Sequence, residues 1–169
     1  NVTAAHLEEY AALTLTDIVS DVETIKNLES VTFDNVFIAM DNINNKISVT
    51  SNNCFMLYWV SPDSLSRAKG FAGYQLLDSL STAMYSDKAL FNKMLSFKSS
   101  EAYSALKGHR KILVDDLIEG FKQSGVNLAP DQLTEYKKLT KEISQLSSSY
   151  SDNMNASNEL LALDEEGAK

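Results

Sequence analysis

The sequence predicts an all-α protein, an elongated antiparallel bundle of five to six helices. Apolar residues recur at three- and four-residue steps along one segment after another, and no segment alternates apolar and polar residues as a strand does. Six Gly and two Pro among 169 residues leave few obligatory breaks. A chain of this length can bury about 70% of the surface that its unfolded form exposes. We therefore expect residues 1–169 to form a single helical domain.

The first two expected helices are amphipathic. The first spans about residues 3–28, and its apolar stripe is Leu7, Ala11, Leu15, Ile18, Val22 and Ile25. Thr32 or Asp34 can cap the second helix. Its apolar positions keep the helical period through an Asn-rich middle: Val36, Met40, Ile43, Ile47, Cys54 and Tyr58.

A third helix is expected to begin at Ser61 and Pro62. Ser61 would be its N-cap, and Pro62 would occupy the first helical position, where a missing N–H costs nothing. Its predicted stripe is Leu65, Ala68, Ala72, Leu76, Leu80 and Met84. Asp87 is then expected to cap a short helix that carries Leu90, Phe91, Met94 and Leu95.

The last third of the chain predicts two longer helices separated by a break. One would start at residues 99–101 and run without interruption through Leu106, Leu113, Leu117 and Phe121. Gly125 would end it, because glycine readily adopts the left-handed conformation that closes a helix. Pro130 would open the final helix, with Leu133, Tyr136, Ile143, Tyr150 and Met154 on one face. Ser147, Ser148, Ser149 and Ser151 would form a face that permits close packing.

The charge balance argues against several classes of partner. Asp and Glu number 23 against 15 Lys and Arg, a net charge of −8 that opposes contact with nucleic acid or anionic membranes. The longest apolar run, Cys54 to Val60, is far shorter than the ~20 residues that cross a bilayer. The first residues lack the basic and apolar regions of a signal peptide, so we favour a cytoplasmic location. Matches to the N-glycosylation triplet at residues 1–3 and 155–157 are too short to outweigh chance.

Few residues can bind a metal. His and Cys are the usual zinc ligands, and only His6, His109 and Cys54 are present. A zinc-binding HExxH helix beginning at His109 would need Glu at 110 and His at 113, where the chain has Arg110 and Leu113. We expect no metal site and no cofactor in this chain. Cys54, among apolar neighbours, is expected to be a buried thiol.

Other candidate sites have simpler structural explanations. His109 follows the stripe of Leu106 and Leu113, so it could be a pocket base, although a hydrogen-bonded core histidine is the better interpretation. Asp115 and Asp116 point about 100° apart on a helix and cannot share an acid–base site. They are better explained as a solvated face near Lys111 and Lys122.

A pair of glycines and a group of aromatic residues are further candidates for binding sites. Gly120 and Gly125 have the spacing of a phosphate-binding loop, but Val126 and Asn127 replace the Lys and Ser or Thr that such a loop needs. The aromatic residues Phe55, Tyr58 and Trp59 could line a peptide groove, although helix packing explains them better. We therefore assign no catalytic residue, and the sequence identifies no substrate-binding residue.

One long segment resembles a known family. Residues 106–157 read as a helix running into DDLIEGFKQSG, a break at VNLAP and a second helix LTEYKKLTKEISQLSSSYSDNMNA. They resemble the N-terminal helical region of the thimet-oligopeptidase-type zinc metallopeptidases. Upstream, VTFDNV at residues 31–36, the run from Phe55 to Leu65 and SDKALF at residues 86–91 are similar to further segments of that family, although Val31 stands where Pro is usual. The segment LDEEG at residues 163–167 resembles the beginning of the next one.

The resemblance implies that this chain is a part of a peptidase that does not itself contain the catalytic residues. Members of the family hydrolyse short peptides in a deep channel, with zinc on an HExxH helix that this chain lacks. The implied role is a wall of the substrate channel and a scaffold for a C-terminal catalytic region beyond Lys169. Two alternatives stay open: a stand-alone helical interaction module without catalysis, and a small protein that binds a ligand between its helices.

Overall fold

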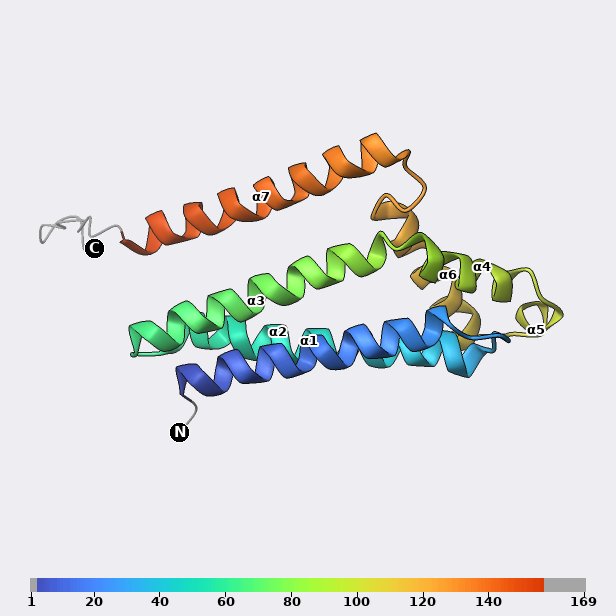
Figure 1. The fold of residues 1–169 in the computed structure, drawn as a ribbon, viewed down its shortest axis with the longest axis horizontal. Helices are drawn as coiled ribbons and strands as arrows, with labels where there is room; N and C mark the ends of the chain where they lie inside the picture. Colours follow the sequence, from blue (N-terminus) through green and yellow to red (C-terminus); the bar gives the residue numbers. More distant parts are fainter. Residues whose placement is uncertain (1–2, 157–169) are drawn as a thin grey trace, which may run out of the picture. The chain divides into compact units, whose positions relative to one another are not determined.

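A computed structural model describes residues 3–156, and every regular element in that range is helical (Figure 1). The all-α prediction is confirmed. The described residues form seven α-helices, six of them of eleven residues or more, and one π-helix. The chain divides into two compact units, Asn1–Leu133 and Thr134–Lys169. The residues that complete both glycosylation triplets, Asn1 and Ser157, and the segment 163–167 lie outside the described range.

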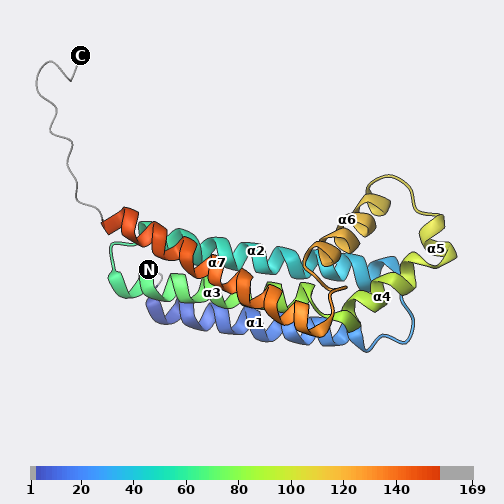
Figure 2. The same cartoon turned by 90° about the horizontal axis from the view of Figure 1, so that it is seen from above.

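In the first unit, three long helices run alongside one another: α1 (Ala4–Lys26), α2 (Ala39–Val60) and α3 (Ser64–Tyr85). Figure 2 shows the shorter helices α4 (Lys88–Lys98), α5 (Glu101–Ser104) and α6 (His109–Gln123) gathered at one end of these three. None of the helices within residues 3–156 is long and apolar enough to cross a membrane.

Local capping explains where α1 and the second helical segment begin. The Thr3 hydroxyl accepts a hydrogen bond from the His6 backbone N–H, and His6 Nδ1 accepts one from the Thr3 N–H, each at 3.3 Å. Thr32 and Asn35 form the same reciprocal pair. Thr32 is thus the cap of the second helical segment, which starts as a π-helix, η1 (Phe33–Ile38), before continuing as α2. The period of apolar residues does not predict this wider turn.

The predicted start of α3 is wrong by two residues. Asp63 is the N-cap and accepts from the Ser66 N–H at 2.8 Å, whereas Ser61 closes α2. Asp is at least as good a cap as Ser, and its carboxylate also accepts from the Ser66 hydroxyl at 2.6 Å. Pro62 therefore precedes the helix.

The predicted stripe of α3 is wrong over its first part, where Leu65, Ala68, Ala72 and Leu76 are exposed, and right at its end, where Met84 is buried and Leu80 packs against the core. The buried residues of the helix are Ser66, Gly70, Gly73, Leu77 and Met84. A Cβ atom on Gly73 would lie 2.9 Å from Cys54 Sγ and 3.2 Å from Ala11 Cβ. The face of α3 that carries its glycines therefore lies against both α1 and α2. Because glycine has no side chain, it lets these helices approach closely.

The predicted helix from residue 99 to Gly125 is two helices. Ser100 caps the four-residue α5, and α6 begins only after Gly108. Gly108 has φ 58° and ψ −136°, a conformation that suits glycine and no L side chain, so the break is built into the backbone. The predicted cap at Asp87 and the closing glycine, Gly125 with φ 82°, are confirmed.

The core of the first unit is formed by α1, η1, α2, α3, α4 and α6. The tilted rings of Phe37 and Phe97 have centroids 5.2 Å apart, and the ring centroids of Phe121 and Tyr85 are 4.7 Å apart. The largest fully buried side chains are Phe37, Phe97, Phe121, Ile18, Ile25, Met40, Ile43, Leu77, Leu90, Met94, Ile118 and Val36. Their burial is the main stabilising contribution to the unit.

The second unit is described from Thr134 to Ala156 and consists of α7 (Pro130–Ala156) without its first turn. Pro130 opens this helix as expected. Taken by itself, this helix is amphipathic, and the larger apolar side chains of its later turns are Leu139, Ile143, Leu146, Tyr150 and Met154.

Candidate functional site

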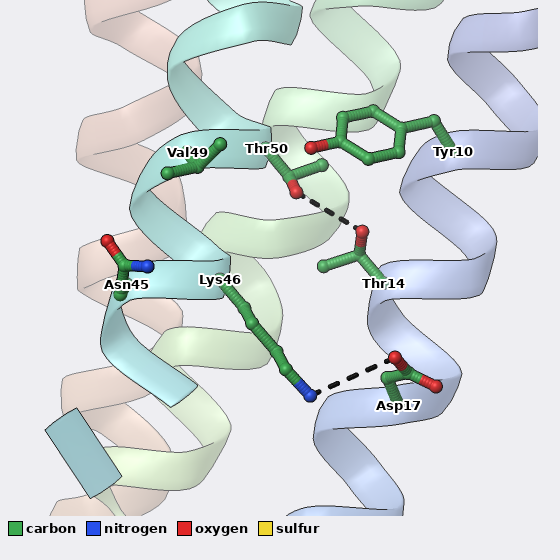
Figure 3. A pocket seen from close by; sticks show the side chains of 7 residues that line it. All are labelled: Tyr10, Thr14, Asp17, Asn45, Lys46, Val49 and Thr50. Carbon is green, nitrogen blue, oxygen red and sulfur yellow. Dashed lines mark hydrogen bonds and ion pairs between the residues drawn. The ribbon is translucent and has the colours of Figure 1, made fainter. Parts of the chain in front are cut away.

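A hollow in the first unit lies between α1 and α2 (Figure 3). Its volume is about 250 Å³, and a neighbouring hollow of about 380 Å³ shares Asn45 and Lys46 with it. The first is lined by Tyr10, Thr14, Asp17, Asn45, Lys46, Val49 and Thr50, and the second adds Asp21, Ala39 and Asn42. We call the two together the α1–α2 groove.

A lysine crosses this groove. Lys46 Nζ lies 2.7 Å from Asp21 Oδ2 and 3.8 Å from Asp17 Oδ2 (Figure 3 shows the Asp17 contact). The hydrogen bond to Asp21 raises the pKa of Lys46. The side chain of Asp17 is 73% exposed, so water screens its attraction to the lysine. Asp17 is thus the carboxylate that remains most accessible to a cation from outside.

Two threonines form the polar floor of the groove. The hydroxyls of Thr14 and Thr50 are 3.2 Å apart, and Thr50 is only 2% exposed. Tyr10 and Val49 border the same end (Figure 3). The groove offers carboxylate, amide and hydroxyl groups that can hydrogen-bond a polar ligand. Its lining has no Cys or His, so no nucleophile is paired with an imidazole base there.

The sequence alone does not reveal this groove. Asp17 and Asp21 lie one turn apart on α1, which the sequence shows. Their partner Lys46 is 25 residues from Asp21, and only the packing register of α1 on α2 brings it into reach. The hydrogen bond between the hydroxyls of Thr14 and Thr50 joins the same two helices in this register.

The three conceivable zinc ligands are not assembled into a site. His6 serves in the cap of α1, and His109 is the exposed first residue of α6. Helix α6 lies at the end of the first unit opposite the start of α1 (Figure 1). Cys54 is buried in α2. Within residues 3–156, no group of three or more His, Cys, Asp or Glu side chains could hold a metal ion.

The sequence neighbours of His109 and Cys54 predict that both side chains are buried in the core. The interpretation of His109 as a core histidine is wrong, because the helix in which it would continue the stripe of Leu106 does not form and α6 starts at His109 itself. The interpretation of Cys54 as a buried thiol is confirmed, and burial raises its pKa. A thiol with a raised pKa is a poor nucleophile at neutral pH.

Asp115 and Asp116 do not share a site. Asp115 accepts hydrogen bonds from Lys98 Nζ and from the Tyr103 hydroxyl, both at 2.8 Å. These bonds lower the pKa of the carboxyl, Lys98 contributing most. Asp116 is exposed. The predicted solvated face near Lys111 and Lys122 therefore fits Asp116, whereas Asp115 pairs with Lys98 and joins α6 to α4.

The glycine pair offers no phosphate cradle. Gly120 lies inside α6, where an added Cβ would meet the Tyr85 ring at 3.4 Å. Only Gly125 is in a turn, with φ 82°. A phosphate-binding loop needs several successive backbone N–H groups free of helix hydrogen bonds, which Gly120 cannot supply.

The aromatic residues of α2 form a cluster with two residues of α3. The ring of Phe55 lies 5.0 Å from that of Tyr74, and the ring of Tyr58 lies 5.0 Å from that of Phe71. Trp59 packs at 5.0 Å against Tyr58. Ring-to-ring contacts of this kind stabilise the α2–α3 pair, in line with the expectation of helix packing.

Comparison of the chain with models of known protein families and with curated proteins finds no match.

Proposed function

We propose that this chain is the non-catalytic N-terminal helical region of a zinc-dependent oligopeptidase of the thimet-oligopeptidase type, and that it forms a wall of the channel that admits short peptides. The proposal rests on the resemblance of residues 106–157 to that family. The observation that carries it is the arrangement of α6, the break at Gly125 and α7, which begins at Pro130. The resembling segment requires this order of helix, break and helix.

The chemistry would belong to the rest of the protein. In the resembled enzymes, zinc polarises the scissile carbonyl and lowers the pKa of the attacking water. The metal would be held by an HExxH helix in the C-terminal catalytic region, the proposed partner of this chain. The residues described here would supply a rigid helical surface that limits access to short, unfolded peptides.

One experiment tests this role directly. The chain is mixed with an HExxH-bearing region encoded beyond Lys169, and cleavage of a quenched fluorescent peptide is followed with and without a zinc chelator. We expect chelator-sensitive turnover in the mixture and none with the chain alone. A reading frame that continues without an HExxH, or two parts that fail to associate at micromolar concentration, would contradict the proposal, because a channel wall should share an extensive interface with the catalytic part.

A second candidate function is a helical interaction module without catalysis. The observation that favours it is the amphipathic pattern of α7, which repeats Leu139, Ile143, Leu146, Tyr150 and Met154 at helical spacing. An amphipathic helix needs another surface against which to bury its apolar face. The candidate gains support if the reading frame ends near Lys169 and the chain associates with another protein through this helix.

A further inference from the structure

Three polar side chains that line the α1–α2 groove make no hydrogen bond within residues 3–156. The carboxylate of Asp17 accepts none in that range, since its nearest cation, Lys46 Nζ, lies 3.8 Å away and bonds to Asp21 (Figure 3). The side-chain amides of Asn42 and Asn45 make none either. Carboxylate oxygens accept hydrogen bonds, and amides both accept and donate them. These groups are therefore available to a ligand.

The floor of the groove adds a hydroxyl donor. The hydroxyls of Thr14 and Thr50 share one hydrogen bond, at 3.2 Å. Each hydroxyl carries one hydrogen, so the pair has two donors, and their mutual contact uses one of them. Neither hydroxyl bonds to another group of residues 3–156. The second hydrogen can therefore be donated to a carbonyl oxygen of a ligand in the groove.

Together these groups match an extended peptide that carries a basic side chain. The amides of Asn42 and Asn45 can pair with peptide N–H and C=O groups, and the threonine hydroxyl can donate to a peptide carbonyl. Asp17 offers two carboxylate oxygens, the arrangement that a guanidinium group binds most strongly. Asp21 is held by Lys46 at 2.7 Å, so the groove has one open carboxylate and takes one cationic side chain. The net charge of −8 adds a long-range attraction for cations.

The length of the groove suits a short peptide. Tyr10 and Asp21 mark its two ends on α1, eleven positions apart. At about 1.5 Å per residue of helix, they are about 16 Å apart along the axis. An extended peptide rises about 3.3 Å per residue, so about five residues span this length. The adjoining hollows of about 250 and 380 Å³ give room for such a segment, because ligand sites usually measure about 300–1,000 Å³.

Other classes of ligand fit the groove less well. A protein-bound metal needs several ligands brought together, and residues 3–156 hold no group of three or more His, Cys, Asp or Glu side chains that could do so. An anion would face the carboxylates of Asp17 and Asp21, with Lys46 the one cation among the described lining residues. An apolar ligand would cover carboxylates and amides without satisfying their hydrogen bonds, which costs free energy.

We propose that the α1–α2 groove binds a short extended peptide, with one arginine or lysine side chain of the peptide on Asp17. This inference deepens the proposed function and rests on it for its biological role: the groove would be the place where the channel wall contacts a basic peptide. The binding itself involves residues of α1 and α2 alone, so it can be measured without the catalytic region. Arginine should bind more tightly than lysine, because its planar guanidinium pairs with both carboxylate oxygens.

Isothermal titration calorimetry of the whole chain with three probes tests the proposal. The first probe is the blocked pentapeptide acetyl-Gly-Gly-Arg-Gly-Gly-amide, the second has neutral citrulline in place of arginine, and the third is butylguanidinium, which has no peptide backbone. We expect the arginine peptide to bind at least about fivefold more tightly than either of the others, since each lacks a set of hydrogen bonds. Equal affinity for the two peptides, or no binding at millimolar concentration, would overturn the proposal. Butylguanidinium that binds as tightly as the arginine peptide would show a site for a small cation and overturn it as well.

Two variants locate the site. In Asp17→Asn, the arginine peptide should bind no more tightly than the citrulline peptide, whereas Asn45→Ala should weaken both peptides by a similar factor of about three and keep their ratio. Asp116→Asn is the matched control, because Asp116 is an exposed carboxylate on α6 and its loss changes the net charge equally. Circular dichroism checks that each variant is folded. If Asp116→Asn removes the discrimination as fully as Asp17→Asn does, net charge alone attracts the peptide and the proposal is wrong.

Failure of this inference and failure of the proposed function give different results. If the groove does not bind the arginine peptide but the chain restores peptidase activity to the HExxH-bearing region, the inference is wrong and the proposed function stands. If the arginine peptide binds as expected but the chain and that region do not associate, the channel-wall role is wrong, and the groove remains a peptide site.

Discussion

Gly70 of α3 lies so close to Cys54 of α2 that a Cβ atom on Gly70 would stand 2.6 Å from the Cys54 carbonyl oxygen. The same atom would lie 3.0 Å from the backbone nitrogen of Tyr58. Both contacts are with backbone, which cannot rotate away as a side chain can. The α2–α3 spacing therefore depends on the absence of a side chain at residue 70.

We predict that Gly70→Ala destabilises the first unit by about 1–3 kcal/mol, the cost of overpacking a close helix contact. Gly120→Ala is the matched control, because its Cβ would make an ordinary 3.4 Å contact with the Tyr85 ring. That control should be neutral or stabilising by up to about 1 kcal/mol through helix propensity. Urea melts of both variants measure the difference. Equal stabilities would show that α3 can move away from α2 at little cost.

Leu117→Ala should destabilise the fold by roughly 2–5 kcal/mol, because truncating a buried leucine leaves a cavity. Leu117 lies mid-helix in α6 and is buried beside Ile118 and Phe121. Ile112→Ala, in the same helix and exposed, should change the free energy of unfolding by less than about 0.5 kcal/mol. A small effect at Leu117 in denaturant melts would mean that α6 contributes little to the core.

The contact between Asp115 and Lys98 predicts a pH dependence. Its hydrogen bonds lower the pKa of Asp115 in the folded chain, so its contribution to stability is present above the unfolded carboxyl pKa of about 3.9 and disappears as pH falls through the lower folded pKa. Asp115→Asn should therefore destabilise the chain at pH 7 and lose this effect in acid. Melts of the parent and variant across pH 2–7, with Asp116→Asn as control, measure it. An Asp115→Asn penalty that persists at the lowest pH would refute the linkage.

The isolated chain should neither bind zinc stoichiometrically nor cleave peptides. His6 caps α1 and His109 begins α6, and neither belongs to an HExxH motif. Elemental analysis of zinc-treated protein and a quenched fluorescent peptide assay test both statements. Turnover that a chelator abolishes and that His109→Ala removes would overturn the assignment of a non-catalytic chain.

Caps and turn residues made much of the fold predictable. Thr32, Asp87, Gly125 and Pro130 act where the sequence places them, because each effect depends on residues within one turn. The errors arose where distant packing or an unusual backbone decides. The leucines of α3 indicated the wrong face, since the close approach of Cys54 needs glycine there and sequence periodicity gives glycine no weight.

The candidate site was less predictable than the fold. Individual polar residues on α1 and α2 are visible in the sequence, but their convergence in the α1–α2 groove depends on how two helices are placed against each other. The break at Gly108 shows the same limit: a glycine between helical residues can be tolerated within a helix or can end it. In this chain Gly108 has a positive φ, and no helix continues through it.

The π-helix at residues 33–38 gives the segment that leads into α2 a tolerance for the loss of one residue that α1 and α3 lack. A π turn holds one residue more than an α turn, as if a single residue had been inserted without lengthening the helix. Removing one exposed residue there, Asp34 or Ile38, would let the segment close as an ordinary α turn between the Thr32 cap and Met40. The same deletion inside α1 or α3 would rotate every later side chain by about 100° and turn buried residues to water. Length variation in this protein is therefore expected to be tolerated within a helix at this point.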